Sequence, residues 1–343
     1  MSMEAQNLVE QTILDIWSSA LGGADVTPAD DFFAVGGDSL LALVTVEQIN
    51  QRLGWELNMG DMLRHRTVAN LVAHKTLPQA ANPHRVLVRM SNRGSRTPLV
   101  FVHPVTGLLF GYTKLVRHLG EDRACHGIQS PALTDSAAPA ADTVRAIAES
   151  YVDLIEDELG EDDFHLAGWS AGAVIALEVA RLATERDLGV RRLVVLDGYI
   201  WDEPPIDTDD AALLAEFRAD LLTQVSPDAP DATVGGPDAR TDAVYRELST
   251  ALFGSAVESG TEFVARLHSA YRTNVRALTA YRPEPADVDA LLLHTAQNYT
   301  RDTWIDVLGN PAVEVLDGDH YGLLRGPEAE KIAARIAAFV GEE

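Results

Sequence analysis

The stretch FHLAGWSAGAVIALEVA, residues 164–180, runs from an apolar segment through a Gly-x-Ser-x-Gly turn into a second segment with helical character. This pattern is typical of an elbow between a strand and a helix, because Gly168 and Gly172 relieve crowding around a strained serine backbone. The start of the helix directs amide donors and a partial positive charge at the negative charge that develops during acyl transfer. The stretch therefore predicts Ser170 as a nucleophile at the end of a buried strand.

Apolar segments alternate with helical segments on both sides of this elbow. The segments RVLVRMS, TPLVFVHP, RRLVVLDG and DALLLHT are expected strands, and TVRAIAESYVDLIEDELG is an expected helix between two of them. Continuous apolar strands joined by helices are typical of a mostly parallel sheet that is covered on both faces. We therefore expect an α/β domain over residues 86–343.

A serine nucleophile requires a base, and the base requires an acid that orients it. Behind such an elbow the order along the chain is serine, acid, histidine. His320, in VEVLDGDHYGLL, is the histidine near the C-terminus and is predicted to be the general base. Asp197, at the end of RRLVVLDG, is the preferred acid, because the later strand ALLLHTAQN offers His294 and no carboxylate. Three other carboxylates are weaker candidates: Asp302, Asp317 and Asp319.

The loop after an earlier strand, in VFVHPVTG, is the expected source of the second donor of an oxyanion hole. We assign the hole to the backbone amides of Val105 and Ala171. His103 in the same loop is interpreted as a structural residue at the strand end, since His320 already fills the role of base. Cys125 is the single cysteine and is interpreted as a small buried residue.

One connection is much longer than the few residues that usually join a helix and a strand. It lies between the strand ending at Asp197 and the strand near Leu291, and contains the helical patterns AALLAEFRADLLTQV, TDAVYRELSTALFG and EFVARLHSAYRTNVRALTAY. We interpret residues of about 200–285 as a helical lid inserted over the strand ends.

Residues 8–75 contain helical patterns without a convincing strand, which predicts a small helical bundle. Within it, VGGDSLLAL places Ser39 at the start of a helix. From these residues alone the favoured interpretation of Ser39 is an ordinary N-cap, although a helix N-terminus also suits a phosphodiester. The segment TLPQAANPHR, residues 76–85, carries two prolines and little apolar content, and is the predicted linker.

The bulk composition excludes several classes of function. The formal net charge of −25 over 343 residues argues against nucleic-acid binding, which requires clustered Lys and Arg. No apolar run is long enough to cross a bilayer, and the first residues lack a signal-peptide pattern. A single cysteine fits a reducing compartment, so we expect a cytoplasmic protein without membrane association. We also expect no metal site.

Two segments resemble the peptidyl carrier proteins of nonribosomal peptide synthetases. DDFFAVGGDSLLALVTVEQIN is similar to their phosphopantetheine attachment region, and MLRHRTVANLVAHK is similar to their last helix. The resemblance covers residues 8–75. It implies that Ser39 carries 4′-phosphopantetheine, added by a separate phosphopantetheinyl transferase, and that the thiol of this arm holds a peptide as a thioester. It also implies upstream condensation and adenylation domains as partners.

Residues 84–343 resemble the type I thioesterase domains, of the α/β-hydrolase family, that terminate such assembly lines. The resemblance rests on FVHPVTG, AGWSAGAV, VVLDGY and GDHYGLL, in that order. It implies a carrier–thioesterase didomain that releases an acyl or peptidyl chain through an ester on Ser170, by hydrolysis or macrocyclisation, in antibiotic or siderophore biosynthesis. It also implies that Asp197 is the acid, His320 the base and Val105 an oxyanion-hole donor, which agrees with the assignments made from the residues.

Alternatives to this function remain open at the level of sequence. Trp169 stands where histidine often stands in this family, and the inserted segment matches no pattern that identifies a substrate. One alternative is a stand-alone serine esterase with an unrelated helical domain. Another is a carrier module whose hydrolase domain binds or proofreads the chain without releasing it.

Overall fold

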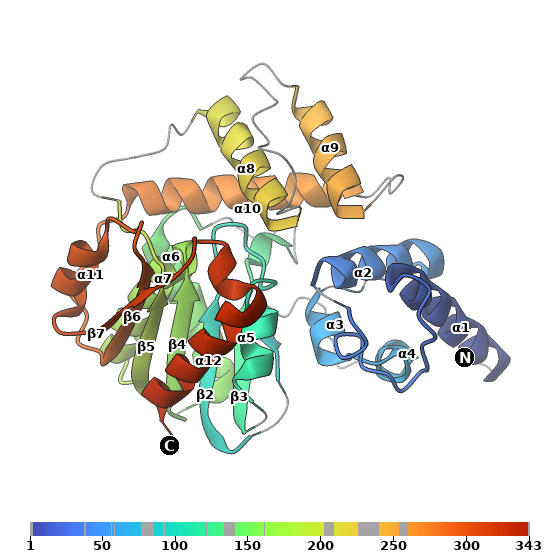
Figure 1. Cartoon of the computed structure of the whole chain (residues 1–343), viewed down its shortest axis with the longest axis horizontal. Helices are drawn as coiled ribbons and strands as arrows, with labels where there is room; N and C mark the ends of the chain where they lie inside the picture. Colours follow the sequence, from blue (N-terminus) through green and yellow to red (C-terminus); the bar gives the residue numbers. More distant parts are fainter. Residues whose placement is uncertain are drawn as a thin grey trace.

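The computed structural model describes residues 3–37, 39–55, 57, 59–76, 86–91, 94–120, 122–133, 141–160, 162–201, 209–225, 240–253 and 260–341. The described elements form an N-terminal helical domain beside an α/β domain (Figure 1). Most of the predicted linker, residues 77–85, lies outside the described part of the chain, so its conformation stays a prediction.

The helical domain buries one apolar core between its helices. Its elements are α1 (Met3–Ala20), α2 (Ser39–Leu53), α3 (Met59–Arg64) and α4 (Val68–Thr76). Trp17 of α1 is fully buried and packs edge-on against Phe32, with ring centroids 4.8 Å apart. Phe32 precedes the glycine pair before Ser39, so the same core that joins the helices also holds the loop that leads to this serine.

The α/β domain is built on one sheet of seven strands. The strands are β1 (Leu87–Arg89), β2 (Arg96–Val102), β3 (Arg123–Ile128), β4 (Phe164–Trp169), β5 (Val190–Leu196), β6 (Ala290–Thr295) and β7 (Ala312–Leu316). Their order is β1-β3-β2-β4-β5-β6-β7. Strands β2 to β7 pair in parallel, and β1 pairs with β3 in the antiparallel direction. The mostly parallel sheet is therefore confirmed, with an antiparallel edge strand.

Helices cover both faces of the sheet, as the continuous apolar strands require. On one face lie α6 (Val144–Leu159), α7 (Ala171–Glu185) and α11 (Arg301–Leu308), which share an apolar core with the strands. The other face carries α5 (Tyr112–His118) and α12 (Gly326–Val340), which contact each other (Figure 1). None of the described helices combines the length and the apolar character needed to cross a membrane.

Three helices lie in the long connection between β5 and β6. They are α8 (Asp210–Val225), α9 (Thr241–Phe253) and α10 (Gly260–Ala280), and we call them the insertion helices. Figure 1 shows them above the sheet, with α10 crossing over the carboxyl ends of the strands. Residues 202–208, 226–239 and 254–259 of the predicted lid lie outside the described part of the chain. The helical insertion is thus present, and its function as a lid stays a prediction.

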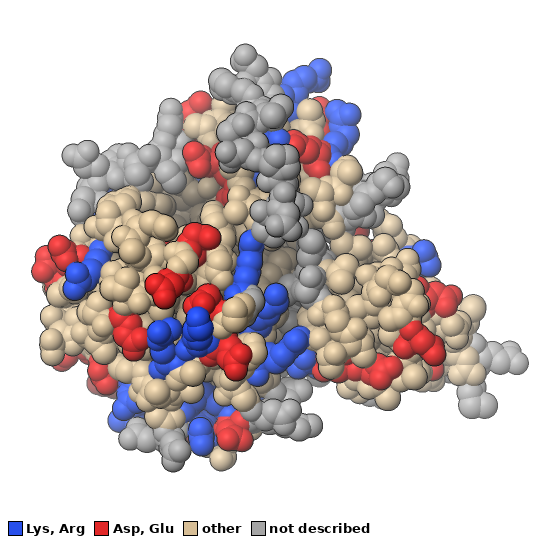
Figure 2. Space-filling view, in the orientation of Figure 1, with Lys and Arg blue, Asp and Glu red and all other residues tan. Residues whose placement is uncertain are grey.

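The two domains contact each other beside α5. The Arg117 guanidinium on α5 donates a hydrogen bond of 2.9 Å to the backbone carbonyl of Phe33 in the helical domain. A cavity of about 690 Å³ lies between Arg66 and Thr67 on one side and Thr113 and Arg117 on the other. Figure 2 shows Lys and Arg side chains gathered on the α/β domain up to this boundary, and Asp and Glu side chains on the helical domain. The cavity at the interface is lined by arginines of both domains, Arg64 and Arg66 of the helical domain and Arg117 of α5.

Candidate active site

Ser170 lies on the predicted elbow between β4 and α7, with φ of 57° and ψ of −129°. This left-handed conformation is strained for a residue other than glycine, and such strain is typical of functional turns. The flanking glycines make the turn possible. A Cβ on Gly168 would lie 2.2 Å from the Gly172 carbonyl oxygen, and a Cβ on Gly172 would lie 2.4 Å from the Val102 carbonyl oxygen. No larger residue fits at either position without a shift of the backbone.

Tyr112 holds the elbow against the neighbouring strand. Its buried hydroxyl accepts a 2.7 Å hydrogen bond from the Trp169 backbone N–H and donates one of 2.7 Å to the Val102 carbonyl. Burial raises the pKa of Tyr112, so the hydroxyl keeps the proton that it donates. This residue was missed by the sequence analysis, since Tyr112 lies in an ordinary apolar position of α5 and no local pattern distinguishes it.

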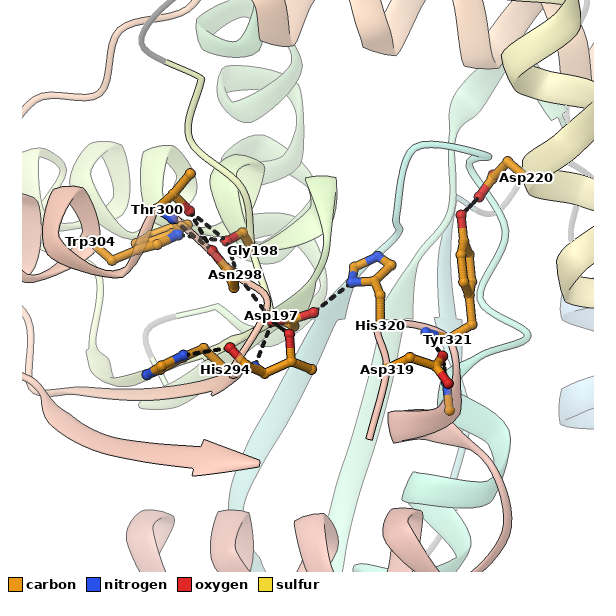
Figure 3. A network of polar contacts seen from close by, with 12 residues as sticks. Asp197, Gly198, Asp220, His294, Asn298, Thr300, Trp304, Asp319, His320 and Tyr321 are labelled. Atoms are coloured by element: carbon orange, nitrogen blue, oxygen red, sulfur yellow. Dashed lines mark hydrogen bonds and ion pairs between the residues drawn. The ribbon is translucent and has the colours of Figure 1, made fainter. Parts of the chain in front are cut away.

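Asp197 and His320 meet although they are 123 residues apart in the sequence. His320 Nδ1 donates a 2.7 Å hydrogen bond to Asp197 Oδ2 (Figure 3). Asp197 follows β5 with φ of 45° and is fully buried, whereas His320 lies in the loop after β7 and is partly exposed. With Nδ1 as the donor, the second ring nitrogen, Nε2, carries a lone pair that can accept a proton. Trp169 stacks on the imidazole, with ring centroids 4.8 Å apart, and limits its rotation.

The second carboxylate oxygen of Asp197 is fully engaged by other donors. Asp197 Oδ1 accepts from the backbone N–H and the hydroxyl of Thr295, at 2.8 and 3.1 Å, and from Asn298 Nδ2 at 3.1 Å. Burial opposes ionisation of this carboxyl, but the hydrogen bonds from His320, Thr295 and Asn298 outweigh it and lower the pKa of Asp197 below its ordinary value. Asp197 is therefore an anion that can orient the imidazole and stabilise its protonated form.

Asn298 connects this acid to a wider polar network. Its side-chain amide also donates a 2.8 Å hydrogen bond to the Gly198 carbonyl, which further accepts from Thr300 Oγ1 at 3.2 Å and Trp304 Nε1 at 2.8 Å (Figure 3). The network fixes the turn after β5 in one conformation. The sequence analysis missed Asn298, although the segment ALLLHTAQN that contains it follows a predicted strand end, where polar side chains gather in parallel sheets.

One cavity of about 270 Å³ brings the predicted catalytic residues together. Ser170 and His320 both line it, with Asp197 buried behind the imidazole. Val105 and Ala171, the two predicted oxyanion-hole residues, line the same cavity, and Ala171 is the first residue of α7. The remaining walls come mainly from α8 and α10 of the insertion. A carbonyl group bound beside Ser170 would thus lie near both the base and the helix N-terminus.

Asn274 of α10 reaches from the insertion to the loop after β2, which contains Val105. Its side-chain amide, which is buried, donates a 2.8 Å hydrogen bond to the Val105 carbonyl. The insertion therefore contributes to the position of the loop that holds Val105, which the sequence analysis did not foresee. The distance between these residues along the chain conceals the contact.

His103 and His294 do not line the catalytic cavity. His103 is buried, donates from Nδ1 to the Pro104 carbonyl at 2.7 Å and accepts at Nε2 from the Tyr151 hydroxyl at 2.6 Å. Burial lowers the pKa of His103 to about 4, so it is neutral near pH 7, in agreement with a structural role. His294 is buried and pairs with the Thr295 carbonyl at 2.9 Å.

The weaker acid candidates and the cysteine also have other surroundings. Asp302 is exposed on α11, and Asp319 accepts from the backbone N–H groups of Tyr321 and Gly322 in the His320 loop. Asp317 is exposed in the turn after β7. Cys125 is buried in β3, and burial raises the pKa of its thiol to about 11, which confirms its interpretation as a buried residue.

Helix α2 begins at Ser39 and runs for 15 residues. The loop before it is tight: Gly36 has φ of 107°, and a Cβ on Gly37 would lie 2.4 Å from the Phe32 ring. Asp38 lies outside the described part of the chain. A helix N-terminus favours the negative charge of a phosphodiester, so this position fits a phosphopantetheine group on Ser39.

Two family models match the chain in separate regions. The thioesterase domain model matches residues 97–340, and the phosphopantetheine attachment site model matches residues 11–74. Chondramide synthase of Chondromyces crocatus is 34% identical over 97% of this chain, which spans 9% of that protein. A dimodular nonribosomal peptide synthase of Bacillus subtilis is 28% identical over 80% of this chain, which spans 11% of that protein. The chain thus spans a small part of the curated relatives that it matches.

Solved structures show the same architecture. A four-domain nonribosomal peptide synthetase in its holo form, bound to AMP and glycine, is similar over 96% of this chain and 26% of its own length, with a TM-score of 0.68 and 25% identity. The Vlm2 thioesterase domain bound with a dodecadepsipeptide is similar over 76% of this chain and 99% of its own length, with a TM-score of 0.54. Its identity of 18% supports the fold alone.

Proposed function

Because the chain belongs to the thioesterase-domain family and has a phosphopantetheine attachment site before that domain, we propose that it releases an acyl or peptidyl chain from its own carrier during nonribosomal peptide biosynthesis. The two family matches confirm the predicted resemblance, the helical domain followed by an α/β domain, the phosphopantetheine cofactor and the class of enzyme. The observation that carries the proposal is the cavity that joins Ser170 and His320, with Asp197 bonded to the imidazole.

In the first half-reaction Ser170 is the proposed nucleophile. The phosphopantetheine arm, when bound at Ser39, supplies the substrate acyl group as a thioester. His320 Nε2 accepts the Ser170 Oγ proton as the oxygen bonds to the acyl carbon, and the backbone amides of Val105 and Ala171 hold the negative charge on the carbonyl oxygen. The carbon–sulfur bond then breaks, and His320 returns the proton to the leaving sulfur. An ester on Ser170 remains.

In the second half-reaction the same groups act on this ester. His320 accepts a proton from the attacking molecule, and returns it to Ser170 Oγ when the ester bond breaks. Attack by water yields an acid, and attack by an amine or hydroxyl of the acyl chain yields a macrocycle. Asp197 stays ionised throughout and stabilises the imidazolium that forms in each half-reaction.

The proposal includes partners that act before release. A phosphopantetheinyl transferase would modify Ser39, and upstream condensation and adenylation domains would supply the acyl chain. Similarity to parts of much longer synthetases supports this order of domains. The cytoplasmic location, expected from the single cysteine, stays a prediction.

The test loads the protein with an acyl-phosphopantetheine from an acyl-CoA analogue and a phosphopantetheinyl transferase, then follows its intact mass. We expect the wild type to gain the acyl arm and then lose the acyl mass. Ser39→Ala should gain no mass, and Ser170→Ala should gain the acyl arm and keep it. Modification of Ser39→Ala at the wild-type level would contradict the attachment site, and acyl release by Ser170→Ala would contradict the nucleophile.

The same experiment separates the two alternative functions. A stand-alone esterase would turn over small esters as fast as the carrier-bound thioester and leave Ser39 unmodified in the wild type. A non-releasing hydrolase domain would give the same slow loss of acyl mass in the wild type and in Ser170→Ala. The expected rapid loss in the wild type alone contradicts both.

A further inference from the structure

The loop that carries His320 is bonded to insertion helix α8 at two points. The Tyr321 hydroxyl donates a hydrogen bond to Asp220 Oδ1 on α8 (Figure 3). Arg325 Nη2, four residues further along the chain, donates to the backbone carbonyls of Thr223 and Gln224 at 2.8 and 3.2 Å. These carbonyls belong to the last turn of α8, where the helix leaves acceptors unused. We call these contacts the α8 clasp.

Hydrogen bonds within the loop connect the clasp to the residues around the imidazole. Asp319 Oδ1 accepts from the backbone N–H groups of Tyr321 and Gly322 at 3.0 and 2.9 Å, and the Arg325 N–H donates to the Gly322 carbonyl at 2.9 Å. The Tyr321 ring also packs edge-on against His320, with centroids 5.1 Å apart. Because the segment is closed by its own hydrogen bonds, a shift of its Tyr321 end moves the imidazole with it.

Asp220 is committed to the clasp. Its Oδ1 accepts from Tyr321 and its Oδ2 accepts from Gln224 Nε2 at 3.1 Å. Burial raises the pKa of this carboxyl above its ordinary value, and the hydrogen bond from Tyr321 opposes that rise. The side chain lines the catalytic cavity, but both of its oxygens already have donors. These two hydrogen bonds hold the carboxylate in the clasp.

We propose that Tyr321 and Arg325 are positioning residues that couple insertion helix α8 to the catalytic base, so that His320 is aligned for proton transfer only while α8 covers the cavity. The inference rests on the proposed function of Ser170 and His320. Helix α8 belongs to the insertion, and the His320 loop belongs to the sheet domain; the clasp joins the two. Movement of α8 away from the cavity breaks both contacts and frees the segment that carries the imidazole. Proton transfer would thus be confined to the covered cavity, where an acyl ester is shielded from bulk water.

The closing experiment compares Tyr321→Phe with Tyr245→Phe. Tyr245 lies on α9, and its hydroxyl pairs with His268 Nδ1 at 2.9 Å within the insertion, so this variant loses a hydrogen bond of the same kind outside the clasp. We expect Tyr321→Phe to lower kcat about tenfold, the rate equivalent of one lost hydrogen bond, with KM nearly unchanged. Amide hydrogen exchange should rise together in residues 210–225 and 319–325. Tyr245→Phe should show neither effect.

Rescue and coupling exclude a general loss of structure. Asp220→Asn keeps an oxygen that can accept from Tyr321, since Gln224 can rotate to accept from the new amide, and should retain kcat within about twofold. Asp220→Ala should match Tyr321→Phe, and the double variant should be no slower than either single variant. Equal exchange and kinetics in Tyr321→Phe and Tyr245→Phe, or additive losses in the double variant, would overturn the coupling. Failure of the nucleophile assignment is seen separately, as turnover by Ser170→Ala.

Discussion

Replacement of Asp197 by asparagine tests the proposed site most directly, because the surrounding donors dictate how the new amide must lie. Oδ1 of Asp197 accepts three hydrogen bonds from Thr295 and Asn298, and Oδ2 accepts one from His320. The asparagine oxygen must take the position that faces three donors, which directs its NH2 group at His320 Nδ1. His320 can then accept this hydrogen bond only with its proton on Nε2. The base is therefore held in the tautomer that cannot accept the Ser170 proton.

The expected loss of kcat is large although aspartate and asparagine side chains have nearly the same shape. A wrongly held tautomer lowers kcat by about 10⁴-fold in serine triads, which corresponds to about 5 kcal/mol of transition-state stabilisation. The assay is the rate of acyl loss from the loaded protein, followed by intact mass, with Asp302→Asn as a control for an exposed carboxyl. Acyl loss by Asp197→Asn within tenfold of the wild-type rate would refute the reasoning, as would an equal loss of rate in Asp302→Asn.

Three further predictions concern pH, packing and the domain interface. Since the pKa of Asp197 is lowered in the folded protein, its ionisation stabilises the fold above its ordinary pKa of 3.8 and loses this effect as the pH falls through the lower value. Urea unfolding should be measured at pH 3 to 7 for the wild type and Asp197→Asn. The difference between their free energies of unfolding should decrease only below about pH 4. Gly172→Ala should lower the free energy of unfolding by about 1–3 kcal/mol and reduce activity, because the new Cβ would lie 2.4 Å from the Val102 carbonyl oxygen. Arg117→Ala removes the bond to the Phe33 carbonyl, and should slow transfer from the carrier about fivefold while leaving turnover of small free thioesters unchanged.

Each of these outcomes has a simple contradiction. A constant difference in the free energy of unfolding down to pH 3 would show that the pKa of Asp197 is not lowered in the folded protein. If Gly172→Ala has the same free energy of unfolding and the same turnover as the wild type, the elbow has room for a methyl group. Lys114, exposed on the same helix as Arg117, is the control for charge alone. If Lys114→Ala slows carrier transfer as much as Arg117→Ala does, the bond to Phe33 has no specific role.

The elbow was predictable because its causes are local. Gly168, Ser170 and Gly172 are near neighbours, and the clashes that exclude a Cβ arise within one strand-turn-helix unit and the adjacent strand. The neighbouring strands have continuous apolar sequences, and this pattern predicts a sheet that is covered by helices on both faces. β3 escaped prediction because its sequence, RACHGI, mixes polar and small residues, yet the fold buries nearly all of it. Its place between β1 and β2 is a property of the sheet order, which no short pattern reveals.

The sequence was sufficient for the identity of the two domains and for the glycines that the elbow requires, and it predicts a serine, an acid and a histidine in that order along the chain. The two domains and the elbow could be predicted because they depend on backbone sterics and on residues close together in the chain. The hydrogen bond from His320 to Asp197, the support from Asn298, the brace from Tyr112 and the clasp from Tyr321 to Asp220 depend on the tertiary structure. The order of the parallel strands and the packing of the insertion bring these distant side chains within hydrogen-bonding distance, and a hydrogen bond acts only over that range.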